Sequence, residues 1–117
     1  MLRVIITDTS DKDRPLLIIK HRNKYLVKTR VPKKYVDTIA NLDPVDALFV
    51  ALANYRLNDA RLNEKYVEKA LVFVNIELYK PIVDGVVESY LQVQDNLLFA
   101  MVVRKIIDIL IRGDDSG

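Results

Sequence analysis

The spacing of the apolar residues changes at Pro32, and this change limits what the chain can fold into. Before Pro32, short apolar and β-branched runs alternate with turn-forming residues, whereas after it apolar residues recur every three or four positions. The first pattern is typical of strands and the second of amphipathic helices. The sequence therefore predicts an α+β fold, in which an N-terminal three-stranded antiparallel sheet precedes a bundle of about four α-helices. A length of 117 residues suits one domain, with a sheet part at 1–31, a helical part at 32–112 and a frayed tail at 113–117.

The hairpin between the second and third strands sets which residues share a face. Three runs are predicted as strands: Leu2–Thr7, Leu16–His21 and Lys24–Val31. Arg22 and Asn23 are enough for a two-residue turn between the last two. A regular turn there predicts four cross-strand pairs: Lys20 with Tyr25, Ile19 with Leu26, Ile18 with Val27 and Leu17 with Lys28.

In this register the hairpin is apolar on both faces. One face carries Tyr25, Val27 and Val31, and the other carries three apolar residues beside its cations: Leu17, Ile19 and Leu26. A sheet that is apolar on both faces is usually covered on both. We therefore expect Leu17, Ile19 and Leu26 to form an interface, with the chain's own helices or with another subunit in a homo-oligomer or protein complex.

The helical part begins after Pro32. Lys33–Leu42 is predicted as a short helix, and Asp43-Pro44 as the start of a central core helix over Val45–Leu57, which is apolar nearly all round. A further helix is expected to run to about Tyr79, with another apolar-periodic stretch beyond Lys80-Pro81, divided near Asp95-Asn96. Residues 71–93 leave an alternative open, because 71–79 alternates like a strand and Asp84-Gly85 is a hairpin signal.

Residues for catalysis are scarce. The chain has no cysteine, one histidine (His21, among basic neighbours) and three glycines, so a thiolate metal site, a nucleophile–base pair and a glycine-rich phosphate loop find no support. We therefore expect a non-enzymatic protein with no cofactor and no metal site. The alternative is a small Mg²⁺-dependent nuclease whose ligands are Asp8, Asp11 and Asp13, although aspartates of this kind are also common turn formers.

Charge is divided unevenly along the chain. Residues 1–34 contain ten Lys or Arg and three Asp, a net charge of +7, whereas residues 35–117 contain eight Lys or Arg and thirteen Asp or Glu, a net charge of −5. The basic hairpin suggests binding to nucleic-acid phosphates. The candidate nucleic-acid-binding residues are Lys20, Arg22, Lys24, Tyr25, Lys28, Arg30, Lys33 and Lys34. We expect an accessory protein that binds DNA or RNA; the alternative is a structural subunit whose basic sheet meets the acidic helices of another copy or partner.

No segment suggests a membrane partner. The longest apolar runs, Ala47–Ala53 and Leu97–Val103, have seven residues each, whereas a membrane-spanning helix needs about 20. The N-terminal apolar run is too short for a signal peptide. The absence of cysteine suits a reducing compartment, and the abundance of Val, Ile, Lys and Arg is thermophile-like. We therefore expect a cytoplasmic protein.

Overall fold

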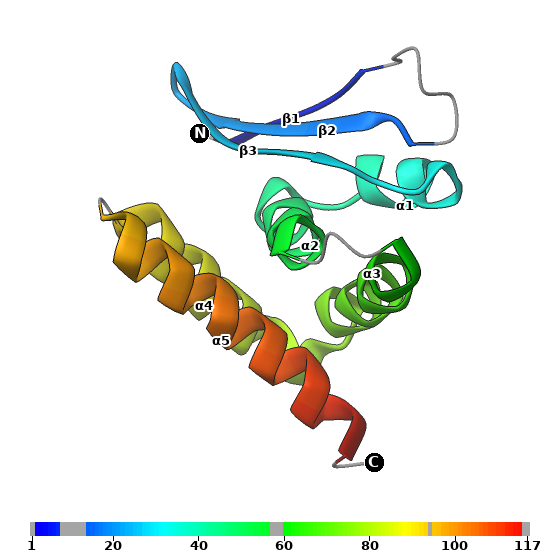
Figure 1. Ribbon diagram of the computed structural model, residues 1–117, viewed down its shortest axis with the longest axis vertical. Helices are drawn as coiled ribbons and strands as arrows, with labels where there is room; N and C mark the ends of the chain where they lie inside the picture. The colour runs from blue at the N-terminus through cyan, green and yellow to red at the C-terminus, as the bar shows by residue number, and fades with distance from the viewer. Residues whose placement is uncertain (1, 8–13, 57–59, 94, 116–117) are drawn as a thin grey trace.

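The fold consists of a sheet with helices on one side of it (Figure 1). The computed structural model describes residues 2–7, 14–56, 60–93 and 95–115, without the side chains of 56, 60–64, 96 and 111–115. The strands are β1 (Leu2–Thr7), β2 (Leu16–His21) and β3 (Lys24–Arg30), in the antiparallel order β1-β2-β3. The helices are α1 (Val36–Ala40), α2 (Pro44–Arg56), α3 (Ala60–Asn75), α4 (Lys80–Gln92) and α5 (Asn96–Asp115), with 3₁₀ turns η1 (Lys33–Tyr35) and η2 (Glu77–Tyr79). The predicted α+β class is confirmed.

The helical reading of residues 71–93 is confirmed, and the hairpin alternative is wrong. Asp84 and Gly85 lie inside α4, and the chain breaks earlier, at Ile76, whose backbone is extended (φ −100°, ψ 119°). A second break separates α4 from α5 near Asp95, as expected. Helix α5 continues to Asp115, so the sequence placed its end, at Gly113, too early.

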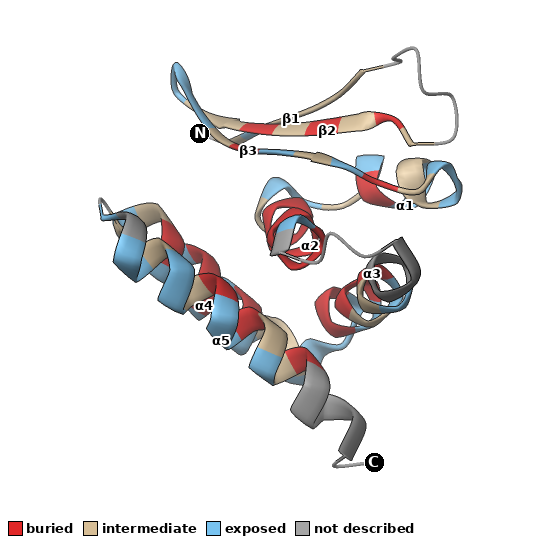
Figure 2. Ribbon diagram, in the orientation of Figure 1, coloured by how far each residue is buried: buried red, intermediate tan, exposed pale blue. Residues whose placement is uncertain are grey.

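Helix α2 is the centre of the core. Its residues 47–53 are all fully buried, because the sheet packs on one side of α2 while α3, α4 and α5 pack on the others. Figure 2 shows this concentration of buried residues along α2. A helix that is covered on all sides has no solvent-exposed face, which explains why the sequence of α2 is apolar nearly all round.

The register of the hairpin differs from the regular one. Lys20 pairs with Tyr25 as predicted, but Ile19 pairs with Val27, Ile18 with Lys28 and Leu17 with Thr29. Leu26 is therefore the extra residue of a β-bulge, and the other three predicted pairs are wrong by one position. A shift of one residue moves every following side chain of β3 to the opposite face.

The bulge exchanges the two faces beyond Leu26. Val27 now lies beside Leu17 and Ile19 against the helices, while Tyr25 is 53% exposed on the other face. Of the two expected partners for Leu17 and Ile19, the chain's own helices are the one observed, because both residues are fully buried in the chain's own core. Leu26 is partly buried and packs against that core. Leu17 and Ile19 are therefore inaccessible to another subunit, whereas Leu26 remains partly exposed.

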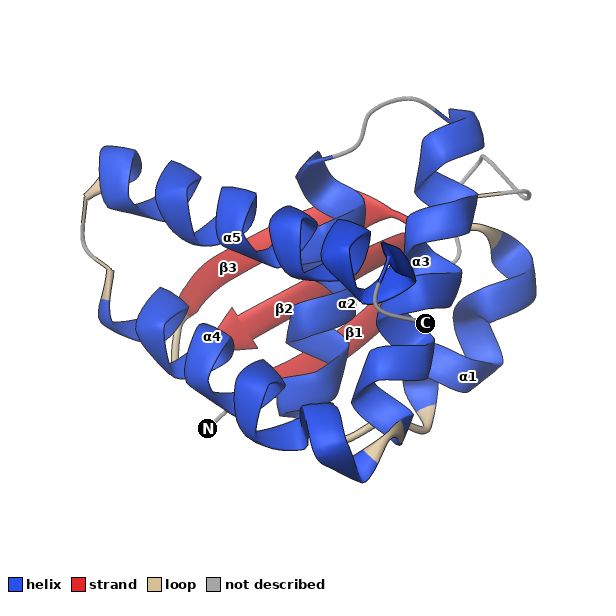
Figure 3. Cartoon of the chain, turned by 90° about the horizontal axis from the view of Figure 1, so that it is seen from below, coloured by secondary structure: helices blue, strands red, loops and turns tan. Residues whose placement is uncertain are grey.

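The described helices cover only one face of the sheet. In Figure 3, viewed from the helical side, the strands lie behind the helices. Leu2, Val4 and Ile6 of β1 pack against the core, as do the inward residues of β2 and β3. The opposite face, which we call the outer sheet face, is not covered by any of these helices (Figure 1). None of the described helices combines the length and apolar character needed to cross a bilayer.

Candidate nucleic-acid interface

The outer sheet face brings together cations from all three strands. Arg3 of β1 lies opposite Lys20 of β2, and on β3 the bulge places Lys28 opposite Ile18 and Arg30 opposite Leu16. Because directly opposite residues share a face of a sheet, these side chains and Tyr25 all lie on the outer sheet face. The face thus carries four cations: Arg3, Lys20, Lys28 and Arg30. No Asp or Glu occurs in the three strands.

The aromatic ring of Tyr25 contacts two of these cations. The Nζ atoms of Lys20 and Lys28 lie 4.8 and 4.1 Å from the centre of its ring. An ammonium group over an aromatic ring is stabilised by about 0.5–1 kcal/mol at an exposed site. The ring therefore offsets part of the repulsion between the two lysines and keeps both charges on the same part of the sheet.

A reciprocal contact positions the cation at the far end of β3. Nη1 of Arg30 donates to the carbonyl oxygen of Arg14 at 3.1 Å, and Nη2 of Arg14 donates to the carbonyl oxygen of Arg30 at 3.4 Å. The guanidinium group of Arg30 is thereby held beside the segment that leads into β2, and that of Arg14 beside the end of β3. Arg14 adds a fifth cation near the edge of the outer sheet face.

The remaining basic residues predicted from the sequence lie elsewhere. Arg22 and Lys24 are exposed at the hairpin tip, where Arg22 has a positive φ of 59°. Lys33 and Lys34 are exposed in η1, after β3 has ended. The cluster that is continuous in the sequence is therefore divided into the outer sheet face, the hairpin tip and η1.

Tyr35 is part of the packing between η1 and α3. Its hydroxyl donates to Oε1 of Glu68 at 2.5 Å, and the Nζ atom of Lys34 lies 5.1 Å from its ring centre. Burial, together with the hydrogen bond and the negative charge of Glu68, raises the pKa of Tyr35 to about 12. This tyrosine therefore ties η1 to a helix and is not equivalent to the exposed Tyr25.

The sequence alone does not single out Arg3 as a candidate binding residue, because its position beside the other cations depends on strand pairing. The sequence shows Arg3 as one cation in an apolar strand, and its place beside Lys20 follows only from the antiparallel pairing of β1 with β2. The alternation of Arg3, Ile5 and Thr7 was the available signal, because those three residues share one face of a strand.

Comparisons of the chain with protein-family models, with curated proteins and with solved structures find no match. The chemistry of the surface is therefore the basis for assigning a function.

The candidate magnesium ligands Asp8, Asp11 and Asp13 lie outside the described residues. Within the part of the chain that the structure describes, no group of three or more His, Cys, Asp or Glu side chains could hold a metal ion. His21 is partly buried at the hairpin tip and, with Arg22 and Lys24, lines one side of a cleft beside β3.

Proposed function

We propose that this protein is a non-enzymatic accessory protein that binds DNA or RNA through the outer sheet face and the hairpin tip. The observation that carries this proposal is the sheet face that the described helices leave uncovered, which carries Arg3, Lys20, Lys28 and Arg30 together with Tyr25. Cations on a rigid sheet lose less conformational freedom on binding than cations on a loop, so the surface is preorganised for phosphate groups.

The rest of the surface confines binding to this region. Exposed acidic residues lie on the helical side, including Glu77 in η2, Glu88 on α4 and Asp108 on α5. These carboxylates repel a polyanion, whereas the outer sheet face attracts it. The apolar residues Ile5 and Ile18 between the cations can contact sugars or bases. Contacts to phosphates dominate, so we expect little dependence on base sequence.

Salt dependence of binding tests the proposal. Fluorescence anisotropy with labelled duplex and single-stranded probes should show log K falling linearly with log salt, with a slope near −3.6 on duplex if four phosphates are contacted, at about −0.9 per contact. Lys28→Ala should weaken binding to all sequences alike and flatten this slope by about one unit. Lys105→Ala, on the exposed side of α5, is the matched control and should have little effect. Absence of binding at low salt, or equal losses in the two variants, would refute the proposal.

A second candidate, an assembly subunit, is favoured by an apolar strip on α5. Leu97, Leu98 and Met101 are 73%, 49% and 60% exposed, and their spacing places them along one side of the helix. Contiguous exposed apolar residues often mark protein interfaces. Light scattering over a concentration series would detect self-association. If this candidate is right, Met101→Lys dissociates the oligomer; a strict monomer would exclude a homo-oligomer.

A further inference from the structure

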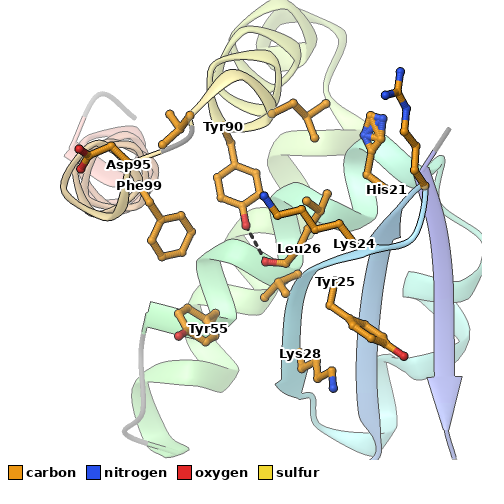
Figure 4. A pocket seen from close by; sticks show the side chains of 13 residues that line it. His21, Lys24, Tyr25, Leu26, Lys28, Tyr55, Tyr90, Asp95 and Phe99 are labelled. Carbon is orange, nitrogen blue, oxygen red and sulfur yellow. Dashed lines mark hydrogen bonds between the residues drawn. The ribbon is translucent and has the colours of Figure 1, made fainter.

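A cleft of about 820 Å³ lies between β3 and the helices, beside the outer sheet face. The hairpin forms one wall, and the end of α2, the end of α4 and the start of α5 form the other (Figure 4). Its size falls within the range of small-molecule sites, which is about 300–1,000 Å³. The outer sheet face and this cleft meet along β3, where Tyr25 and Lys28 of the outer sheet face also line the cleft.

The helical wall of the cleft is aromatic. Phe99 lies with its ring centre 5.2 Å from that of Tyr90 and 6.3 Å from that of Tyr55. Tyr90 is buried, and its hydroxyl donates to the carbonyl oxygen of Leu26 at 2.6 Å. Tyr55, in contrast, is 46% exposed. The three rings therefore form a fixed aromatic wall, of which Tyr55 is the most accessible part.

The hairpin wall is basic. Arg22, Lys24 and Lys28 line it, and in Figure 4 the side chain of Lys24 extends from the hairpin toward Tyr90. Asp95 is the one acid among the described lining residues, and its Oδ1 accepts the backbone N–H of Leu97 at 2.7 Å at the start of α5. The cleft therefore pairs aromatic surface with positive charge across a short distance.

From this pairing we infer that the cleft binds an unpaired nucleotide, with its base against Tyr55 and Phe99 and its phosphate at Lys24 and Arg22. The inference rests on the proposed function and specifies the class of ligand, which is single-stranded nucleic acid. A base in a duplex is stacked and paired on both sides, so it cannot enter an aromatic cleft without leaving the helix. An unpaired base can stack there whatever its identity, because every base has a flat π-face.

Stacking of one base on an aromatic side chain contributes enough to be measured separately from phosphate contacts. Loss of such a contact by alanine substitution weakens binding by about 5- to 150-fold. Wild-type protein should therefore bind a labelled thymidine strand of about 12 nucleotides more tightly than the same backbone with abasic sites. The duplex of the same length should show neither the gain nor the loss.

Tyr55→Ala is the test variant and Tyr25→Ala is the comparison variant. Tyr25 is similarly exposed and also borders the cleft, but its ring contacts Lys20 and Lys28 of the outer sheet face and is not part of the aromatic wall. Tyr55→Ala should weaken binding to the thymidine strand by about 5-fold or more, leave the abasic strand unaffected and keep the salt slope unchanged. Tyr25→Ala should retain the preference for the strand with bases. Tyr55→Leu, which keeps an apolar side chain, should behave like Tyr55→Ala, and circular dichroism of all three variants checks that they fold.

Three results would overturn the inference. Equal binding of thymidine and abasic strands, with a steep salt slope, would refute the cleft while leaving the proposed function intact. A base preference that disappears in Tyr25→Ala but persists in Tyr55→Ala would place the base on the outer sheet face instead. Absence of binding by every probe at low salt would refute both the cleft and the proposed function.

Discussion

Removal of the Tyr90 hydroxyl tests what holds the bulge in place. This group donates to the carbonyl oxygen of Leu26, the extra residue of the bulge, in a partly buried hydrogen bond. Tyr90→Phe retains the ring and its contact with Phe99 but leaves that carbonyl without its partner. A partly buried acceptor left unpaired costs about 1–2 kcal/mol. For a chain of this length, such a loss lowers Tm by roughly 4–8 °C.

The pH dependence of this penalty provides a second measurement. Burial, and to a smaller extent the neighbouring Tyr55, raises the pKa of Tyr90 to about 12 from its ordinary value of 10. Below pH 10 the hydroxyl is protonated in both the folded and the unfolded chain, so its contribution to stability is fully present. Between pH 10 and 12 the unfolded chain loses this proton first, so wild-type stability falls as the pH rises. Phenylalanine has no proton to lose, so the penalty of Tyr90→Phe should shrink by about 1 kcal/mol at pH 11.

Urea unfolding followed by circular dichroism at pH 7 and pH 11 gives both quantities. Tyr55→Phe is the control, because Tyr55 is half-exposed and its substitution should change the free energy of unfolding by less than about 0.5 kcal/mol. If Tyr90→Phe is as stable as wild type at pH 7, the hydroxyl does not hold the bulge. If its penalty is the same at both pH values, burial does not raise the pKa of Tyr90.

Four further substitutions test the register, the turn and a partly buried ion pair by thermal and urea unfolding. Ile19→Lys should prevent folding because the Ile19 side chain is fully buried. Ile18→Lys, on the outer sheet face, should change the free energy of unfolding by less than about 1 kcal/mol. Equal effects of the two substitutions would contradict the bulged register. Arg22→Asn should stabilise the protein by about 0.5–1 kcal/mol, because asparagine tolerates positive φ better than arginine does, and a loss of stability would show that the Arg22 side chain has a structural role. Asp46→Ala should cost about 1–2 kcal/mol, because the buried carboxylate accepts from Lys80 Nζ at 2.5 Å; an unchanged free energy of unfolding would show that Asp84, 3.0 Å from Lys80, replaces it.

The parts of the fold that could be predicted depend on local pattern. The change at Pro32, the start of α2 at Pro44 and the apolar character of that helix are visible within short windows of sequence. The bulge is not, because its carbonyl is held by a tyrosine 64 residues further along the chain. The aromatic cleft was missed for the same reason: Tyr55, Tyr90 and Phe99 come from three helices, and their proximity follows from packing.

The packing of α2 beneath the sheet makes the regular register of the hairpin energetically unfavourable. That register puts Lys28 opposite Leu17, so its ammonium group would point into the helices, while Val27 would be exposed. The bulge instead buries Val27 and leaves Lys28 exposed. Burying a valine side chain contributes about 1.5–3 kcal/mol, and burying an unpaired ammonium group costs several. Both effects favour the bulge and outweigh the ladder hydrogen bonds that it disturbs.

The same contacts also decide which part of the sheet is available for binding. β3 is an edge strand, and an open edge invites the addition of another strand. Here Tyr90 donates to the carbonyl oxygen of Leu26, and Nδ2 of Asn54 donates to that of Arg30 at 2.6 Å. Two carbonyl groups of β3 are thus already engaged by α4 and α2, and the bulge interrupts the regular spacing that strand addition requires. We therefore expect the proposed nucleic-acid ligand to contact the cations of the outer sheet face and the aromatic rings of the cleft, and not the backbone of β3.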